Sequence, residues 1–151
     1  MNCKKEIYLI SIVENFSGYA WCINRNRQFV YFNKRLKDVI KEEFSEEIRE
    51  GDSIYAPLKQ LDPSAIDAWE LVYEKSFAGE SQHFVHQFYI QNRPVYLDLF
   101  ITPVEENSEV VGVSCTAIDI SDQILNQKLF NEAEARFRAI NKLPSRSLTG
   151  P

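Results

Sequence analysis

The sequence has few of the residues that build metal centres and disulfide frameworks. Its three cysteines, Cys3, Cys22 and Cys115, are an odd number and have no close spacing. They form neither a disulfide framework nor a zinc motif, and they suit a reducing compartment. The two histidines, His83 and His86, lie three residues apart on an expected strand and point to opposite faces, so they cannot share an ion. We therefore expect no metal site.

The sequence also lacks a concentrated positive charge and a long apolar run. Its 17 Lys and Arg are scattered and are outweighed by 22 Asp and Glu, which gives a net charge of −5. Nucleic-acid binding needs a concentrated basic footprint, so we expect no nucleic-acid partner. No apolar run approaches the roughly 20 residues of a membrane span, so we expect no direct membrane contact. Glu14 and Asn15 follow the apolar "IYLISIV" where a signal peptide has small residues, which favours a cytoplasmic location.

Aromatic side chains, in contrast, are plentiful, with ten Phe, seven Tyr and two Trp among 151 residues. This length fits one domain with a bulky core plus a short extension. Hydrophobic periodicity predicts five strands, with helices concentrated in the middle of the chain. We therefore expect an α+β fold, an antiparallel sheet covered by helices on one face. The expected elements are helix 3–16, strands 19–23 and 29–32, helices 34–44 and 63–78, strands 83–90, 95–104 and 109–118, and a C-terminal helix.

The helix expected over residues 63–78 has the clearest boundaries. Asp62 is an N-cap, Pro63 occupies the first helical position, and Gly79 ends the helix. Asn33 is expected to cap the shorter helix that follows the first hairpin. The longer helix carries one bulky apolar stripe at spacings of three and four, formed by Ile66, Trp69, Tyr73 and Phe77.

Two expected hairpins carry a family resemblance. They are "AWCINRNRQFVYFNKRL" and "PVYLDLFITPVEENSEVVGVSCTAIDISDQ", the second of which ends in Asp119-Ile120-Ser121. The first resembles the opening hairpin, and the second the closing hairpin with its Asp-Ile-Thr signature, of the PAS domain, the sensory-box module of bacterial signal-transduction proteins. The resemblance covers about residues 5–122. The turns "NRNR" and "EENSE" lack the usual Gly, which leaves the loop conformations open. The implied domains are an N-terminal flanking helix (1–17), a PAS domain (18–120), a signalling helix (121–140) and a disordered tail (141–151).

The resemblance implies a non-enzymatic sensory domain of a histidine kinase or diguanylate cyclase type of protein. Such a domain senses a small ligand or a partner and relays the signal through its C-terminal helix to an effector domain. The signal-relay residues would be Asp119, Ile120 and Ser121; a plain helix cap without a signalling role is the alternative. Haem and flavin are both disfavoured, because helix 63–78 has no histidine and the Asn-Cys-Arg-Phe run of the flavin branch is absent.

Any ligand site is expected between the sheet and helix 63–78. The inward side chains would be Trp69, Tyr73, Phe84, His86 and Phe88, an aromatic set with one polar group. Simple core packing, with His86 bonded to a backbone carbonyl, is the alternative. A ligand-free dimerisation spacer remains open as a function. So does a small α+β cavity enzyme, which would need a convergent acid–base pair of which only His86 is evident.

Both flanking helices carry apolar stripes. Leu9, Ile12, Val13 and Phe16 can pack on the core, whereas the separate stripe of Ile7 and Ile10 needs another partner, and we expect a homodimer through this helix. Leu125, Leu129, Ala133, Phe137 and Ile140 suit a paired signalling helix that leads into another domain, or a helix packed on its own sheet. Pro144 and Gly150 predict that this helix stops before the tail.

Overall fold

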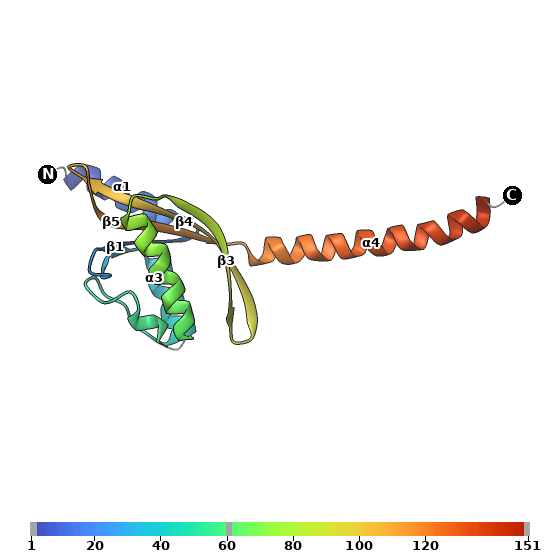
Figure 1. The fold of residues 1–151 in the computed structure, drawn as a ribbon, viewed down its shortest axis with the longest axis horizontal. Coiled ribbons are helices and arrows are strands. Elements are labelled where there is room, and N and C mark those ends of the chain that lie inside the picture. Colours follow the sequence, from blue (N-terminus) through green and yellow to red (C-terminus); the bar gives the residue numbers. More distant parts are fainter. Residues whose placement is uncertain (1–2, 60–61, 150–151) are drawn as a thin grey trace.

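Five antiparallel strands form a single sheet in the order β2-β1-β5-β4-β3 (Figure 1). The structure is a computed structural model that describes residues 3–59 and 62–149, with side chains placed for 4–59 and 62–141. The long apolar run near the end of the chain forms the middle strand, β5, whose inward residues Val113, Cys115 and Ala117 are almost fully buried. The strands are β1 (Tyr19–Asn24), β2 (Phe29–Phe32), β3 (Gln82–Ile90), β4 (Arg93–Glu106) and β5 (Glu109–Asp119).

Helices cover one face of this sheet, which confirms the predicted α+β class. The covering elements are α2 (Lys34–Phe44), the short 3-10 helix η1 (Ala56–Leu58) and α3 (Pro63–Phe77). Two further helices flank the domain, α1 (Cys3–Asn15) and α4 (Ser121–Thr149). In Figure 1, α1 runs beside the strands on the side away from α3, and α4 projects from the body. The described part of the chain contains no helix of the length and apolarity that crossing a membrane requires.

The core lies between α3 and the inner face of the three central strands. Alternate residues of β1, β4 and β5 point to this face and are almost fully buried. The apolar stripe of α3 faces them, with Tyr73 and Phe77 buried and Ile66 and Trp69 half-buried. The predicted boundaries of α3 hold: Asp62 accepts a hydrogen bond from the Ser64 N–H, and Gly79 has a positive φ of 104°. The largest fully buried sheet residues are Ile23, Leu99, Ile101, Val113 and Cys115.

The two long hairpins turn without glycine. Gln91 and Asn92 join β3 to β4, Asn107 and Ser108 join β4 to β5, and all four have φ between 50° and 65°. Positive φ at both central residues is the geometry of a type I′ turn, whose twist matches that of the flanking strands. Of the two loops that the sequence left open, "EENSE" therefore contains a tight two-residue turn, held by residues under some backbone strain. The other loop, "NRNR", leads into the longer connection between β1 and β2, where Arg27 has a φ of 59°.

Helix α1 differs from its expected packing. Val13 and Phe16 are half-buried, but Leu9 and Ile12 are exposed, as are Ile7 and Ile10. The C-terminal end of α1 is tied to the body: Glu14 accepts hydrogen bonds from the Tyr31 hydroxyl (2.6 Å) and the Lys34 N–H (2.7 Å). The stripe predicted to pack on the core is therefore mostly open to solvent.

Helix α4 also differs from the sequence prediction at its far end. The helix continues through Pro144 to Thr149, so the part of the expected tail that is described, residues 141–149, is helical. Residues 150 and 151 lie outside the described part. A proline within a helix removes one N–H donor and introduces a clash, but it can be accommodated with a local kink. Pro144 alone was therefore too weak a reason to end the helix.

Asn33 joins three elements at the covered side of the sheet. Its side chain is fully buried, and its Oδ1 accepts hydrogen bonds from the Leu36 N–H (3.1 Å) and the Ala20 N–H (3.2 Å). Its Nδ2 donates to the carbonyl oxygens of Gly18 (3.1 Å) and Val13 (3.2 Å). The expected N-cap of α2 is thus confirmed, and the same amide also fixes β1 and the end of α1.

We expect Asn33→Ala to lower the free energy of unfolding by about 3 kcal/mol, because it removes a helix cap and leaves buried backbone groups unpaired. Urea denaturation followed by circular dichroism measures the change. Asn26→Ala, in the exposed β1–β2 turn, is the matched control and should change stability by less than about 0.5 kcal/mol. Equal stability of the two variants would contradict the role given to Asn33.

Candidate functional site

A cavity of about 630 Å³ lies between the sheet and the helices α2, η1 and α3. Its volume falls within the range of small-molecule binding sites. The strands contribute inward side chains of β1, β3 and β4, and the helices contribute apolar side chains from the facing side. The wall includes Tyr19, Trp21, Trp69, Tyr73, His86, Phe88, Val95 and Leu97, and the charged lining residues are Glu42, Glu43, Asp62, Arg93 and Asp119.

Four of the five predicted ligand-site residues line this cavity. Trp69 and Tyr73 come from α3, and His86 and Phe88 come from β3. Phe84 does not line the cavity: it shares the inward face of β3 but packs against the core cluster. It lies two residues farther than His86 from the β3–β4 turn.

Aromatic rings form a continuous wall around Trp69. Its ring centroid lies 5.6 Å from that of Tyr73, 5.7 Å from that of His86 and 6.4 Å from that of Trp21. The contacts with Trp21 and His86 are edge-to-face, with interplanar angles of 63° and 71°. Such tilted pairs are the favourable geometry for aromatic rings, so the wall is held in place by its own contacts.

The deep polar groups of the wall are paired and neutral. The Trp21 indole N–H donates a hydrogen bond to the Tyr73 hydroxyl at 3.1 Å. Burial raises the pKa of the Tyr73 hydroxyl and of the neighbouring Cys115 thiol well above their ordinary values. Burial also raises the pKa of the Cys22 thiol. Neither thiol therefore has the lowered pKa of a reactive nucleophile.

His86 is a polar side chain of the cavity wall that is available to a bound molecule. It is half-buried, and burial lowers the pKa of its imidazole, so the neutral form is favoured. Within the described residues its ring makes aromatic contacts with Trp69 and Phe88, and no hydrogen bond to its ring nitrogens is found. The expected bond to a backbone carbonyl is thus absent from the described part. A neutral imidazole offers one donor and one acceptor to a ligand.

The charged lining residues are mostly acidic. Glu42 and Glu43 come from the last turns of α2, Asp62 precedes α3, and Asp119 ends β5. The one cation among the charged lining residues is Arg93 at the start of β4, whose Nη2 lies 3.4 Å from Oε1 of Glu43. This ion pair connects the β3–β4 hairpin to α2 across one side of the cavity.

The described residues show no metal site and no acid–base pair in the cavity. They include no cluster of three or more His, Cys, Asp or Glu side chains that could hold a metal ion. His83, on the outer face of the sheet, is the histidine that contacts a carboxylate, with its Nε2 2.6 Å from Oδ1 of Asp98. His83 and His86 therefore point to opposite faces, as the sequence predicts, and the carboxylate partner belongs to the histidine outside the cavity.

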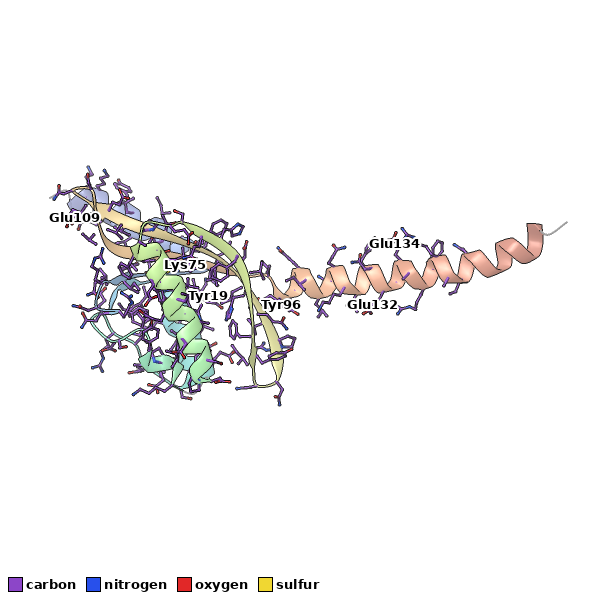
Figure 2. The ribbon with its side chains drawn as sticks, viewed as in Figure 1. Tyr19, Lys75, Tyr96, Glu109, Glu132 and Glu134 are labelled. Carbon is purple, nitrogen blue, oxygen red and sulfur yellow. The ribbon has the colours of Figure 1, made fainter. Side chains whose placement is uncertain are left out.

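The junction between β5 and α4 is fastened to one residue of β4. Tyr96 accepts a hydrogen bond from the Ile120 N–H at its carbonyl oxygen (2.9 Å), and its own N–H donates to the Ser121 hydroxyl (2.9 Å). Asp119 accepts from the Ser121 N–H at 2.9 Å, which is the predicted cap. Lys128 of α4 donates to the Tyr96 hydroxyl at 3.3 Å. Figure 2 shows Tyr96 at the point where α4 leaves the sheet.

Sequence reasoning missed three of these features. Trp21 alternates with Tyr19 and Ile23 on β1, so strand periodicity was a sufficient signal to place it in the wall. Tyr96 and Arg93 had no such signal, because their roles depend on partners 25 and 50 residues away in the chain. Contacts of this kind follow from tertiary structure and not from a local pattern.

Comparison with known proteins shows similarity in structure only. No family profile matches the sequence, and no curated protein matches it. The PAS domain of BvgS from Bordetella pertussis superimposes with a TM-score of 0.64 at 15% identity, over 87% of this chain and 98% of that domain. The N-terminal domain of a diguanylate cyclase with a PAS/PAC sensor from Marinobacter aquaeolei superimposes with a TM-score of 0.53 at 15% identity, over 70% of this chain and 97% of that one. A sensory box histidine kinase from Vibrio cholerae superimposes with a TM-score of 0.52 at 16% identity, over 78% of this chain and 90% of that one. The chain has the PAS fold.

The lowered pKa of His86 makes the stability of the domain depend on pH. Its folded-state pKa lies below the unfolded value of about 6.5, so the unfolded chain binds more protons than the folded chain as the pH falls through that value. Protonation of the unfolded state then reduces stability. We expect acidification from pH 7.5 to pH 5.5 to shift the urea midpoint less in His86→Gln than in the unaltered protein.

His83→Gln is the control, because it removes the histidine on the opposite face. The charged cavity residues remain in every variant, so their own titration cancels in the comparison. If His86→Gln loses as much stability on acidification as the unaltered protein, burial does not hold His86 neutral.

Proposed function

We propose that this chain is a PAS-type sensory domain of a bacterial signal-transduction protein, of the histidine kinase or diguanylate cyclase type. It binds a small ligand in the cavity and relays binding through α4 to an effector domain. The observation that carries the proposal is the position of Tyr96: it lies between two cavity-lining residues of β4 and holds the first residues of α4.

The cavity supplies the sensing part of the proposal. Its aromatic wall provides apolar area, and His86 provides a single neutral hydrogen-bonding group, which is the composition of a small-molecule site. Burial raises the pKa of the Tyr73 hydroxyl and of the Cys115 thiol and keeps both protonated, so neither places a negative charge next to the ligand.

The alternation of β4 supplies the relay. Val95 and Leu97 point into the cavity, while Tyr96 between them points to the other face. A ligand that displaces Val95 or Leu97 moves the backbone of Tyr96, because the three residues are consecutive on one strand. That backbone carries the bonds to Ile120 and Ser121, so the start of α4 moves with it.

Helix α4 has the surface of an output helix. It leaves the body beyond Lys128, the last of its residues with a described bond to the sheet, and Figure 1 shows it extended away from the domain. The apolar side chains of α4 are exposed, so the described part of the helix does not bury them against its own sheet. The exposed set is Leu125, Leu129, Phe130, Phe137 and Ile140.

A second candidate function is a ligand-free dimerisation spacer. The apolar surface of α1 favours it, because that surface does not depend on the cavity being filled. Ile7, Leu9, Ile10 and Ile12 are each between 47% and 68% exposed. A second copy of the chain is the partner that we propose for this surface, since one self-complementary contact would cover α1 in both copies.

Native mass spectrometry of the full chain tests ligand binding. We expect a retained small molecule that is lost from His86→Leu and Trp69→Leu, whose folds remain intact by circular dichroism, and that is kept by Phe100→Leu on the outer face. Hydrogen exchange at residues 121–126 should then differ between the loaded protein and protein stripped of its ligand.

Two results would count against the proposed function. A protein that retains no added mass after purification from any cell extract, and whose cavity variants behave as the unaltered chain, favours the spacer. Unchanged exchange at 121–126 on stripping would mean that the cavity does not communicate with α4.

Self-association through α1 is tested separately. We expect Ile10→Glu to shift the protein from dimer to monomer in light scattering, because it places a charge in the apolar surface of α1. Leu71→Glu on α3 is the matched control, since Leu71 is 54% exposed but lies on the helical side of the domain. A protein that is already monomeric at high micromolar concentration would contradict the proposed dimer.

A further inference from the structure

The charges that line the cavity are distributed unevenly, and this bears on the chemistry of its ligand. Four carboxylates, those of Glu42, Glu43, Asp62 and Asp119, line the cavity together with the single guanidinium of Arg93. Arg93 is paired with Glu43, which leaves an acidic excess. We propose that the ligand of this cavity is a small organic cation, an amine attached to a compact aromatic or apolar body. This inference rests on the proposed ligand-binding function.

The wall of the cavity suits a cation as well as an apolar body. The faces of Trp, Tyr and Phe rings carry negative electrostatic potential and attract ammonium groups within about 6 Å. Trp21, Trp69, Tyr73 and Phe88 supply four such rings around one space. Few other arrangements of side chains stabilise both an apolar body and a positive charge.

The interior offers nothing that would repel a cation. His86 is the one basic side chain in the deep wall, and its lowered pKa keeps it uncharged near neutral pH. Its ring nitrogens have no described hydrogen-bond partner, so one of them can accept a bond from an N–H of the ligand. A charged imidazole would instead have favoured an anion.

An anionic ligand fits the same site poorly. A carboxylate or phosphate would meet the acidic excess and would have only Arg93 as a cationic partner, after breaking its pair with Glu43. The repulsion is partly screened in water, so it acts as a preference between ligands of equal shape. Charge should therefore order the affinities of ligands that differ only in their head group.

Three indole compounds provide such a set. Tryptamine, tryptophol and indole-3-acetate share one ring and one ring N–H, and their head groups are cationic, neutral and anionic. We measure their binding to the full chain, stripped of retained ligand, by isothermal titration calorimetry at low ionic strength. We expect tryptamine to bind about tenfold more tightly than tryptophol, and indole-3-acetate to bind most weakly; added salt should narrow these differences.

Variants of the lining test whether its charge is responsible. Glu42→Gln should weaken tryptamine about threefold and leave tryptophol unchanged, whereas Arg93→Gln should strengthen tryptamine. Glu132→Gln removes the same charge from α4, far from the cavity in Figure 2, and should change neither affinity. Opposite effects of the two cavity variants on one ligand would not arise from a general loss of structure.

The outcomes separate this inference from the proposed function. If tryptophol or indole-3-acetate binds most tightly, the proposal of a cationic ligand is wrong, while the proposal that the cavity binds a ligand stands. If none of the three binds at millimolar concentration, the assignment to an organic cation is overturned, and native mass spectrometry decides whether the cavity binds any ligand. If Glu42→Gln and Arg93→Gln both keep the same preference for tryptamine over tryptophol as the unaltered protein, the assignment to an organic cation is also overturned.

Discussion

The buried amide of Asn33 is the constraint on which the arrangement of the cavity depends. Its two acceptor and two donor bonds fix β1, the start of α2 and the end of α1 with one side chain. Gly18 completes this corner, because a Cβ there would lie 2.3 Å from the Ala117 carbonyl oxygen of β5. Since α2 and β1 form two walls of the cavity, the position of the site follows from a hydrogen-bond network that lies outside it.

A second network holds the opposite wall. Arg27 in the β1–β2 turn makes a bidentate ion pair with Glu70 of α3, with a shortest N···O distance of 2.7 Å, and the Tyr55 hydroxyl bonds to the same carboxylate. The guanidinium also lies 4.4 Å from the centroid of the Phe77 ring. These contacts anchor α3 to the β1–β2 turn, and α3 carries Trp69 and Tyr73 of the cavity wall. The cavity is thus supported from both sides by polar contacts at its margins.

The sequence predicted the parts of this structure that depend on local pattern. Strand alternation, the caps at Asn33 and Asp62, and the stripe of α3 gave the fold class and four cavity residues, because periodicity decides which side chains point inward. It failed for Phe84, whose inward direction was right but which packs against the core cluster and does not line the cavity. It failed for α1, since periodicity shows that Leu9 and Ile12 share a face but not whether the helix lies against the core. The bonds of Tyr96 and the pair of Arg93 with Glu43 required the tertiary structure.

We propose that the cavity and the relay are connected through the energetics of packing. An open apolar space of this size leaves its wall without contact partners, and a ligand restores those contacts. Binding therefore stabilises the arrangement of β3, β4 and α3 that surrounds the ligand. Val95 and Leu97 belong to that arrangement, and Tyr96 between them belongs to the anchor of α4. Because α4 makes few other contacts with the body, its orientation depends on this anchor. In the proposed relay, a small change in the packing of β4 would be carried outward along α4, and the displacement would increase with distance from the sheet.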